Sequence, residues 1–168
     1  MMKRAALLLL SVVLATSVHA RDMWRTDYQA ALEEAKQEKK MVLLKFTAPD
    51  WDYGSVQFDK LVAAKPGFIQ YARKNLILVE VNFPQRKKQD PNLQSQNLGL
   101  LKQYGGDHLI PAVILLNSKG EEIARQTGNL PNEVDLLVKW IEAAKKRSEH
   151  PQASPPSPAQ SATQSPQT

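Results

Sequence analysis

Cysteine is absent from the 168-residue sequence. Without a thiol, the chain cannot form a disulfide, bind a metal through thiolates or use a cysteine nucleophile. It also cannot perform thiol–disulfide exchange with its own residues, and it offers no cysteine for a lipid anchor. Beyond the first 20 residues the histidines are His108 and His150, neither of which lies in a ligand pattern. We therefore predict no metal site and no cofactor.

The sequence also lacks strong charge of one sign and a membrane-spanning run. Lys and Arg total 22 against 17 Asp and Glu, a net charge of +5, which is too small to indicate nucleic-acid binding. The longest apolar stretch, residues 5–15, is shorter than the ~20 residues that span a bilayer. No glycine-rich phosphate loop or Ser/His/Asp set is present. The basic cluster at residues 86–88 is predicted to be solvated surface.

Both ends of the sequence differ in composition from the middle. Residues 1–20 have the layout of a secretory signal peptide, with a basic start, an apolar stretch, and the small residues Val18 and Ala20 before the cleavage point. We expect cleavage after Ala20 and a periplasmic or secreted protein that no longer touches the membrane; an uncleaved anchor is the alternative. Residues 148–168 are rich in Pro, Ser and Gln, which predicts a disordered tail or a proline-rich ligand.

The middle segment, residues 21–147, has the patterns of a single α/β domain. The apolar runs MVLLKFT and LILVEVN, at residues 41–47 and 76–82, predict two central strands. A Ser-Lys-Gly turn between two further β-rich runs predicts a hairpin at residues 112–117 and 121–127. Thr26 and Gln29 have the spacing of a capping box for the first helix. Helices are predicted at residues 26–39, 52–64, 66–74, 93–104 and from residue 131. This order predicts a four-stranded mixed sheet with helices on both faces.

Two short strings carry a resemblance to a known family. FTAPDW, residues 46–51, follows the first long strand, and Ile110-Pro111 precedes the third. With the order of the elements, these strings resemble the thioredoxin-like family over residues 24–147. Residues 41–52 are similar to secreted bacterial members that carry Phe-Thr-x-x-Asp-Trp-Cys-x-x-Cys. The resemblance implies a thioredoxin-like α/β fold in which a cis Ile110–Pro111 bond faces a helix that starts at Asp52.

The two reactive positions of that string are changed here. In the family, the residue after the tryptophan is the nucleophilic cysteine, and the residue three positions further on is the resolving cysteine. This sequence has Asp52 and Ser55 there. A carboxylate cannot attack a disulfide, and a hydroxyl cannot release a mixed disulfide. Lys45 also stands where redox members often hold a proton-transferring aspartate. The resemblance thus implies the fold without the oxidoreductase activity.

Family members bind extended peptides beside the cis-proline by strand addition, and the resemblance implies a similar face here. We predict an exported, non-catalytic domain that binds an extended peptide or a partner protein. The predicted contact residues are Trp51, Asp52, Tyr53, Gly54, Ser55, Ile110 and Pro111.

Other interpretations stay open at this point. Asp52 can serve only as a helix N-cap, which contributes about 1 kcal/mol, and Trp51 and Pro111 can serve only in packing. An enzyme of another class would need a second titratable group beside Asp52, such as Lys45 or His108. A passive assembly module would hold its partner through the tail or the last helix.

Overall fold

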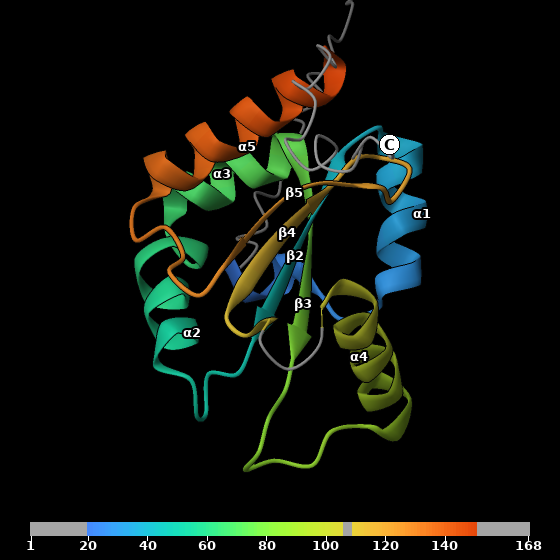
Figure 1. Ribbon diagram of the computed structural model, residues 1–168, viewed down its shortest axis with the longest axis vertical. Coiled ribbons are helices and arrows are strands. Elements are labelled where there is room, and N and C mark those ends of the chain that lie inside the picture. The colour runs from blue at the N-terminus through green and yellow to red at the C-terminus, as the bar shows by residue number, and fades with distance from the viewer. Residues whose placement is uncertain (1–19, 106–108, 151–168) are drawn as a thin grey trace, which may run out of the picture.

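The computed structural model describes residues 20–105 and 109–150. Residues 1–19 of the predicted signal peptide, His108, and the tail beyond His150 lie outside these residues. In the described part of the chain, no helix is long and apolar enough to cross a membrane. The elements, in chain order (Figure 1), are η1 (Ala20–Met23), β1 (Trp24–Arg25), α1 (Tyr28–Glu38), β2 (Met41–Thr47), α2 (Tyr53–Phe58), η2 (Asp59–Ala63), α3 (Pro66–Asn75), β3 (Leu76–Asn82), α4 (Pro91–Tyr104), β4 (Ala112–Leu116), β5 (Glu122–Thr127) and α5 (Val134–Glu149).

The sheet is mixed and has five strands in the order β1-β3-β2-β4-β5. β2 runs parallel to β3 and antiparallel to β4, and β4 and β5 form the predicted hairpin. The predicted fold class is confirmed, but the predicted count of four strands is wrong by one. β1 was missed because its two residues, paired with β3, are too few to show a period-two pattern.

Helices cover both faces of the sheet, as predicted (Figure 1). One apolar cluster lies under α1 and α4, where the Phe46 and Tyr104 rings meet edge to face with centroids 6.0 Å apart. The other lies under α2, η2, α3 and α5 and includes Phe68. Successive residues of β2 supply opposite sides, Leu44 the first cluster and Leu43 the second. β2 is therefore buried on both faces, which explains its continuous apolar run.

Several helix ends differ from the sequence predictions; α4, for example, begins at Pro91 and not at residue 93. α1 is capped by Asp27, whose Oδ1 accepts the Ala30 N–H at 2.9 Å, and not by the capping box at Thr26. α5 begins at Val134 and extends through Glu149, two residues into the predicted tail. Its start lies three residues beyond Pro131, and residues 131–133 have no helical conformation.

Candidate functional site

The chain turns sharply between β2 and α2, at the predicted site. The N–H groups of Trp51 and Asp52 both donate to the Ala48 carbonyl, at 3.1 and 2.7 Å. Asp52 is the N-cap of α2, and its Oδ2 accepts the Ser55 N–H at 2.6 Å. A hydrogen-bonded cap of this kind holds the first turn of the helix in place. Asp52 as a whole is half-buried.

Ser55 has a structural position. Its side chain is only 2% exposed, and its Oγ accepts the Ala48 N–H at 2.9 Å. The hydroxyl thus links the first turn of α2 to the end of β2. Ser55 was predicted as a contact residue; because its hydroxyl is buried and already hydrogen-bonded to the backbone, it is left out of the binding face proposed below.

The loop before β4 packs directly against the start of α2. The Ile110–Pro111 peptide bond is cis, and Pro111 is buried beneath Gly54. A Cβ added to Gly54 would lie 2.8 Å from Pro111 Cγ and 3.3 Å from Asp52 Oδ2. The fold therefore brings residues 51–55 and 110–111 together. Only a glycine fits at this contact without displacing one of the two segments.

The backbone beside Pro111 leaves one acceptor available. The Pro111 carbonyl accepts the Gly128 N–H at 2.8 Å. In the described residues, no group donates a hydrogen bond to the carbonyl of Ile110, whose residue is only half-buried. An unpaired carbonyl just before the start of a strand can accept a hydrogen bond from an added extended chain.

Exposed apolar side chains gather at the start of α2. Most large apolar side chains of the described residues are covered, and those with the greatest exposure are Trp51 (46%), Tyr53 (76%), Val56 (39%), Leu98 (52%) and Leu136 (48%). The first three lie within residues 51–56, in the turn before α2 and at the start of that helix. Exposed apolar side chains that lie together, unlike scattered single residues, are typical of binding surfaces.

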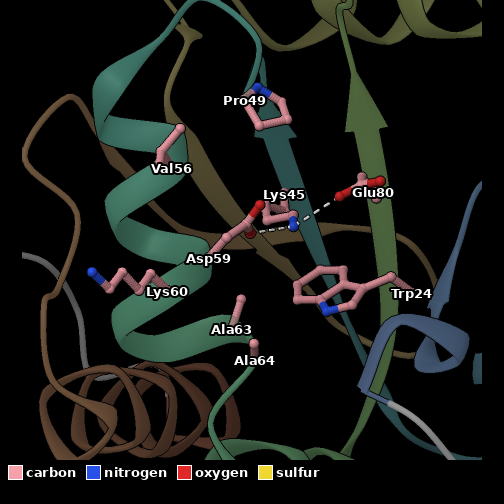
Figure 2. Close-up of a pocket in the computed structure, with 9 residues that line it drawn as sticks. All are labelled: Trp24, Lys45, Pro49, Val56, Asp59, Lys60, Ala63, Ala64 and Glu80. Carbon is pink, nitrogen blue, oxygen red and sulfur yellow. Dashed lines mark hydrogen bonds and ion pairs between the residues drawn. The ribbon is translucent and has the colours of Figure 1, made fainter.

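A cavity of about 570 Å³ lies on the inner side of α2 and η2 (Figure 2). At its floor the Lys45 ammonium donates to Asp59 Oδ1 at 2.6 Å and contacts Glu80 Oε1 at 2.8 Å. The ammonium also lies 4.4 Å from the centroid of the Trp24 ring. Lys45 is buried at 3% exposure, whereas Lys60, at the rim of the cavity, points away from the Lys45 ammonium (Figure 2). The charged groups at the floor of the cavity are therefore already paired with one another.

This arrangement weighs against an enzyme that uses Asp52 with Lys45. The Lys45 ammonium is engaged by Asp59, Glu80 and Trp24, and Asp52 is engaged by the helix. His108, the other candidate partner, lies outside the described residues. In the described ranges, no group of three or more His, Asp and Glu residues is placed to hold a metal ion.

A second cavity, of about 490 Å³, lies on the outer side of Trp51. Its walls include Phe83 from the loop after β3 and Leu98 from α4, together with Lys87 and Lys88. The prediction of a plain solvated surface for the basic cluster is incomplete, because two of its lysines line this cavity. The sequence shows the basic run between a strand and a helix, but no pattern in it indicates that the run lies beside Trp51.

Asp50 anchors the loop that carries this basic cluster. Its Oδ2 accepts the N–H groups of Gln85 and Arg86, each at 2.8 Å. The Arg86 N–H is the main cause of a lowered pKa of the Asp50 carboxyl, the Gln85 N–H acts in the same direction, and desolvation opposes them. The ionised carboxylate thus fixes the loop against the turn that holds Trp51.

Comparison with known proteins agrees with this geometry. The sequence profile described as a thioredoxin-like domain matches residues 28–145. The "Thioredoxin-related protein DsbJ" of Chlamydia pneumoniae is 33% identical over 138 residues, which is 79% of this chain and 39% of that protein. The "Disulfide bond reductase DsbH" of the same organism is 29% identical over 129 residues, or 77% of this chain and 76% of that protein.

The fold comparison gives the same result. A solved structure described as "DsbH Oxidoreductase" superposes with a TM-score of 0.68 at 26% identity, covering 85% of this chain and 95% of that one. The profile covers well over half of the chain, and the resemblance inferred from residues 46–51 and 110–111 is confirmed. The chain belongs to the thioredoxin-like domain family, as a member that contains no cysteine.

Proposed function

We propose that this chain is a non-catalytic thioredoxin-like domain that binds an extended segment of a partner protein. The proposed binding face, called the α2 face below, consists of Trp51, Asp52, Tyr53, Gly54, Ile110 and Pro111. The observation that carries the proposal is a combination of two features. Trp51 and Tyr53 are exposed, and the Ile110 carbonyl accepts no hydrogen bond from the described residues. Main-chain hydrogen bonding at the carbonyl provides attachment, and the aromatic side chains provide selectivity.

The energetics favour a segment with apolar side chains. Covering the exposed part of one large aromatic side chain contributes on the order of 1–2 kcal/mol. A partner that covers both Trp51 and Tyr53 can therefore bind measurably through a short segment. A bound chain in extended conformation presents alternate side chains to the surface, so every second residue of the segment should be apolar.

We also propose that the domain acts outside the cytoplasm and is not an enzyme. The layout of residues 1–20 supports export. The lack of any thiol excludes the exchange chemistry of a disulfide reductase from this chain. The engagement of Lys45 by its ion-pair partners leaves no evident base beside Asp52.

A peptide titration tests the α2 face. The probe is an acetylated and amidated octapeptide of alternating serine and leucine, added to isotope-labelled protein and followed by NMR. We expect shifts at the Tyr53, Gly54 and Ile110 amides and at the Trp51 indole. Trp51→Ala should weaken binding of the peptide at least about tenfold, because a covered aromatic anchor commonly contributes more than 1.4 kcal/mol to the binding free energy.

The matched control is Leu136→Ala on α5. Leu136 is 48% exposed, close to the 46% of Trp51, so both changes remove an exposed apolar side chain. The control should leave the affinity unchanged. Shifts confined to α5, or equal losses in the two variants, would reject the α2 face as the binding site.

A further inference from the structure

The outer cavity shares Trp51 with the α2 face, and what is inferred from it rests on the proposed function. Trp51 is shared between the two, since it belongs to the α2 face and also lines the cavity. Its indole Nε1 donates to the Phe83 carbonyl at 2.9 Å. This bond fixes the ring across the loop, with nearly half of its surface open.

The cavity has an apolar wall. Leu98 projects from α4 with 52% of its surface exposed, and it faces the same hollow as Trp51 and Phe83. Leu98 and Trp51 are among the most exposed large apolar side chains of the described residues. An apolar side chain of a bound segment would cover both of them at once.

The charge of the cavity has one sign. Its charged lining residues are Lys87 and Lys88, and in the described residues neither forms an ion pair with a carboxylate. The nearby acids are engaged by backbone N–H groups. Asp50 holds the loop as described above, and Asp90 Oδ1 accepts the N–H groups that start α4, at 2.9 and 3.1 Å. The lysine charges are therefore available to an incoming anion.

We propose that this cavity selects partner segments in which an acidic residue lies next to a bulky apolar one. The apolar side chain packs against Trp51 and Leu98, and the carboxylate is placed between Lys87 and Lys88. The acidic residue must lie beside the two lysines and away from the Asp52 carboxylate, which would repel it. The partner is an acidic, leucine-type segment of a protein, bound in extended form.

The test compares three octapeptides of one design with the full domain. Leucine alternates with glutamate, with serine or with lysine, and every peptide is acetylated and amidated. Binding is followed by NMR at the Trp51 indole and the Leu98 amide, at low and at high salt. We expect the glutamate peptide to bind about tenfold more tightly than the lysine peptide at low salt, and the difference to shrink as salt screens the charges.

Charge reversal identifies the residues responsible. The variant Lys87→Glu/Lys88→Glu should lose the preference for glutamate while it still binds the serine peptide. The control, Lys119→Glu/Lys139→Glu, makes the same change in net charge at exposed positions in the β4–β5 turn and on α5. It should leave the preference intact. Inorganic phosphate at the same concentration should not displace the glutamate peptide.

The possible failures can be told apart. If no peptide shifts Trp51 or Gly54, the α2 face and this inference both fail. If the three peptides bind equally, or the two charge-reversal variants behave alike, the face remains and the acidic preference is refuted. Displacement of the glutamate peptide by phosphate would also refute it, because the cavity would then be a general anion site.

Discussion

The Lys45→Glu variant is expected to lose about 3–5 kcal/mol of its free energy of unfolding. Lys45 is buried at 3% exposure and is the cation between the Asp59 and Glu80 carboxylates. A glutamate there would place three carboxylates together at the floor of a cavity, with no cation among them. The Asp59 and Glu80 side chains are 33% and 29% exposed. Water can therefore still hydrate both carboxylates, which limits the loss of stability.

Two further variants separate charge from packing. Lys45→Met, which removes the charge but keeps the length of the side chain, should cost less, about 2 kcal/mol. Lys60→Glu changes the charge of an exposed residue at the rim of the same cavity and should cost below about 0.5 kcal/mol. Urea unfolding of the three variants measures these differences. Equal losses for Lys45→Glu and Lys60→Glu would show that the buried ion-pair cluster does not support the fold.

Gly54→Ala and Gly99→Ala should change stability in opposite directions. An alanine Cβ at Gly54 would lie 2.8 Å from Pro111 Cγ, so α2 and the proline loop would have to move apart. We expect a loss of about 1–3 kcal/mol from this overpacking. Gly99 lies inside α4, and an added Cβ there meets nothing within 4 Å. The same change at Gly99 should stabilise the protein by about 0.5–1 kcal/mol.

Thermal or urea unfolding of both variants provides the measurement. The Gly54 variant should also bind the serine–leucine octapeptide more weakly, because the two segments of the α2 face would be separated. The Gly99 variant should bind it as the unchanged protein does. A stabilised Gly54 variant with normal peptide affinity would mean that the close contact with Pro111 is not a constraint on the face.

The buried strands could be predicted with accuracy from the sequence. β2 and β3 begin and end at the predicted residues, 41–47 and 76–82. A strand buried on both faces needs apolar residues almost throughout, and such a run has visible limits. The helix start at Asp52 was implied by the family resemblance, and the interpretation of Asp52 as an N-cap is confirmed by the hydrogen bond from the Ser55 N–H.

Contacts between distant segments could not be predicted from the sequence. Lys45 and Glu80 each interrupt an apolar strand, and the register places them side by side. That coincidence was a signal for a buried ion pair, but the third member, Asp59, comes from η2, and a helix–sheet contact leaves no local pattern. The cavity between Trp51 and Lys88 was missed for the same reason, since its walls come from separate loops and α4.

Site-specific photo-crosslinking in cells tests the central claim most directly. Tyr53 is the most exposed large apolar residue described, at 76%, and benzoylphenylalanine in its place would lie on the α2 face. The control places the same group at Leu136 on α5. We predict crosslinks to one or more partner proteins from position 53, identified by mass spectrometry, and none of these from position 136. No adduct at position 53, or identical adducts at both positions, would contradict a partner-binding role for this face.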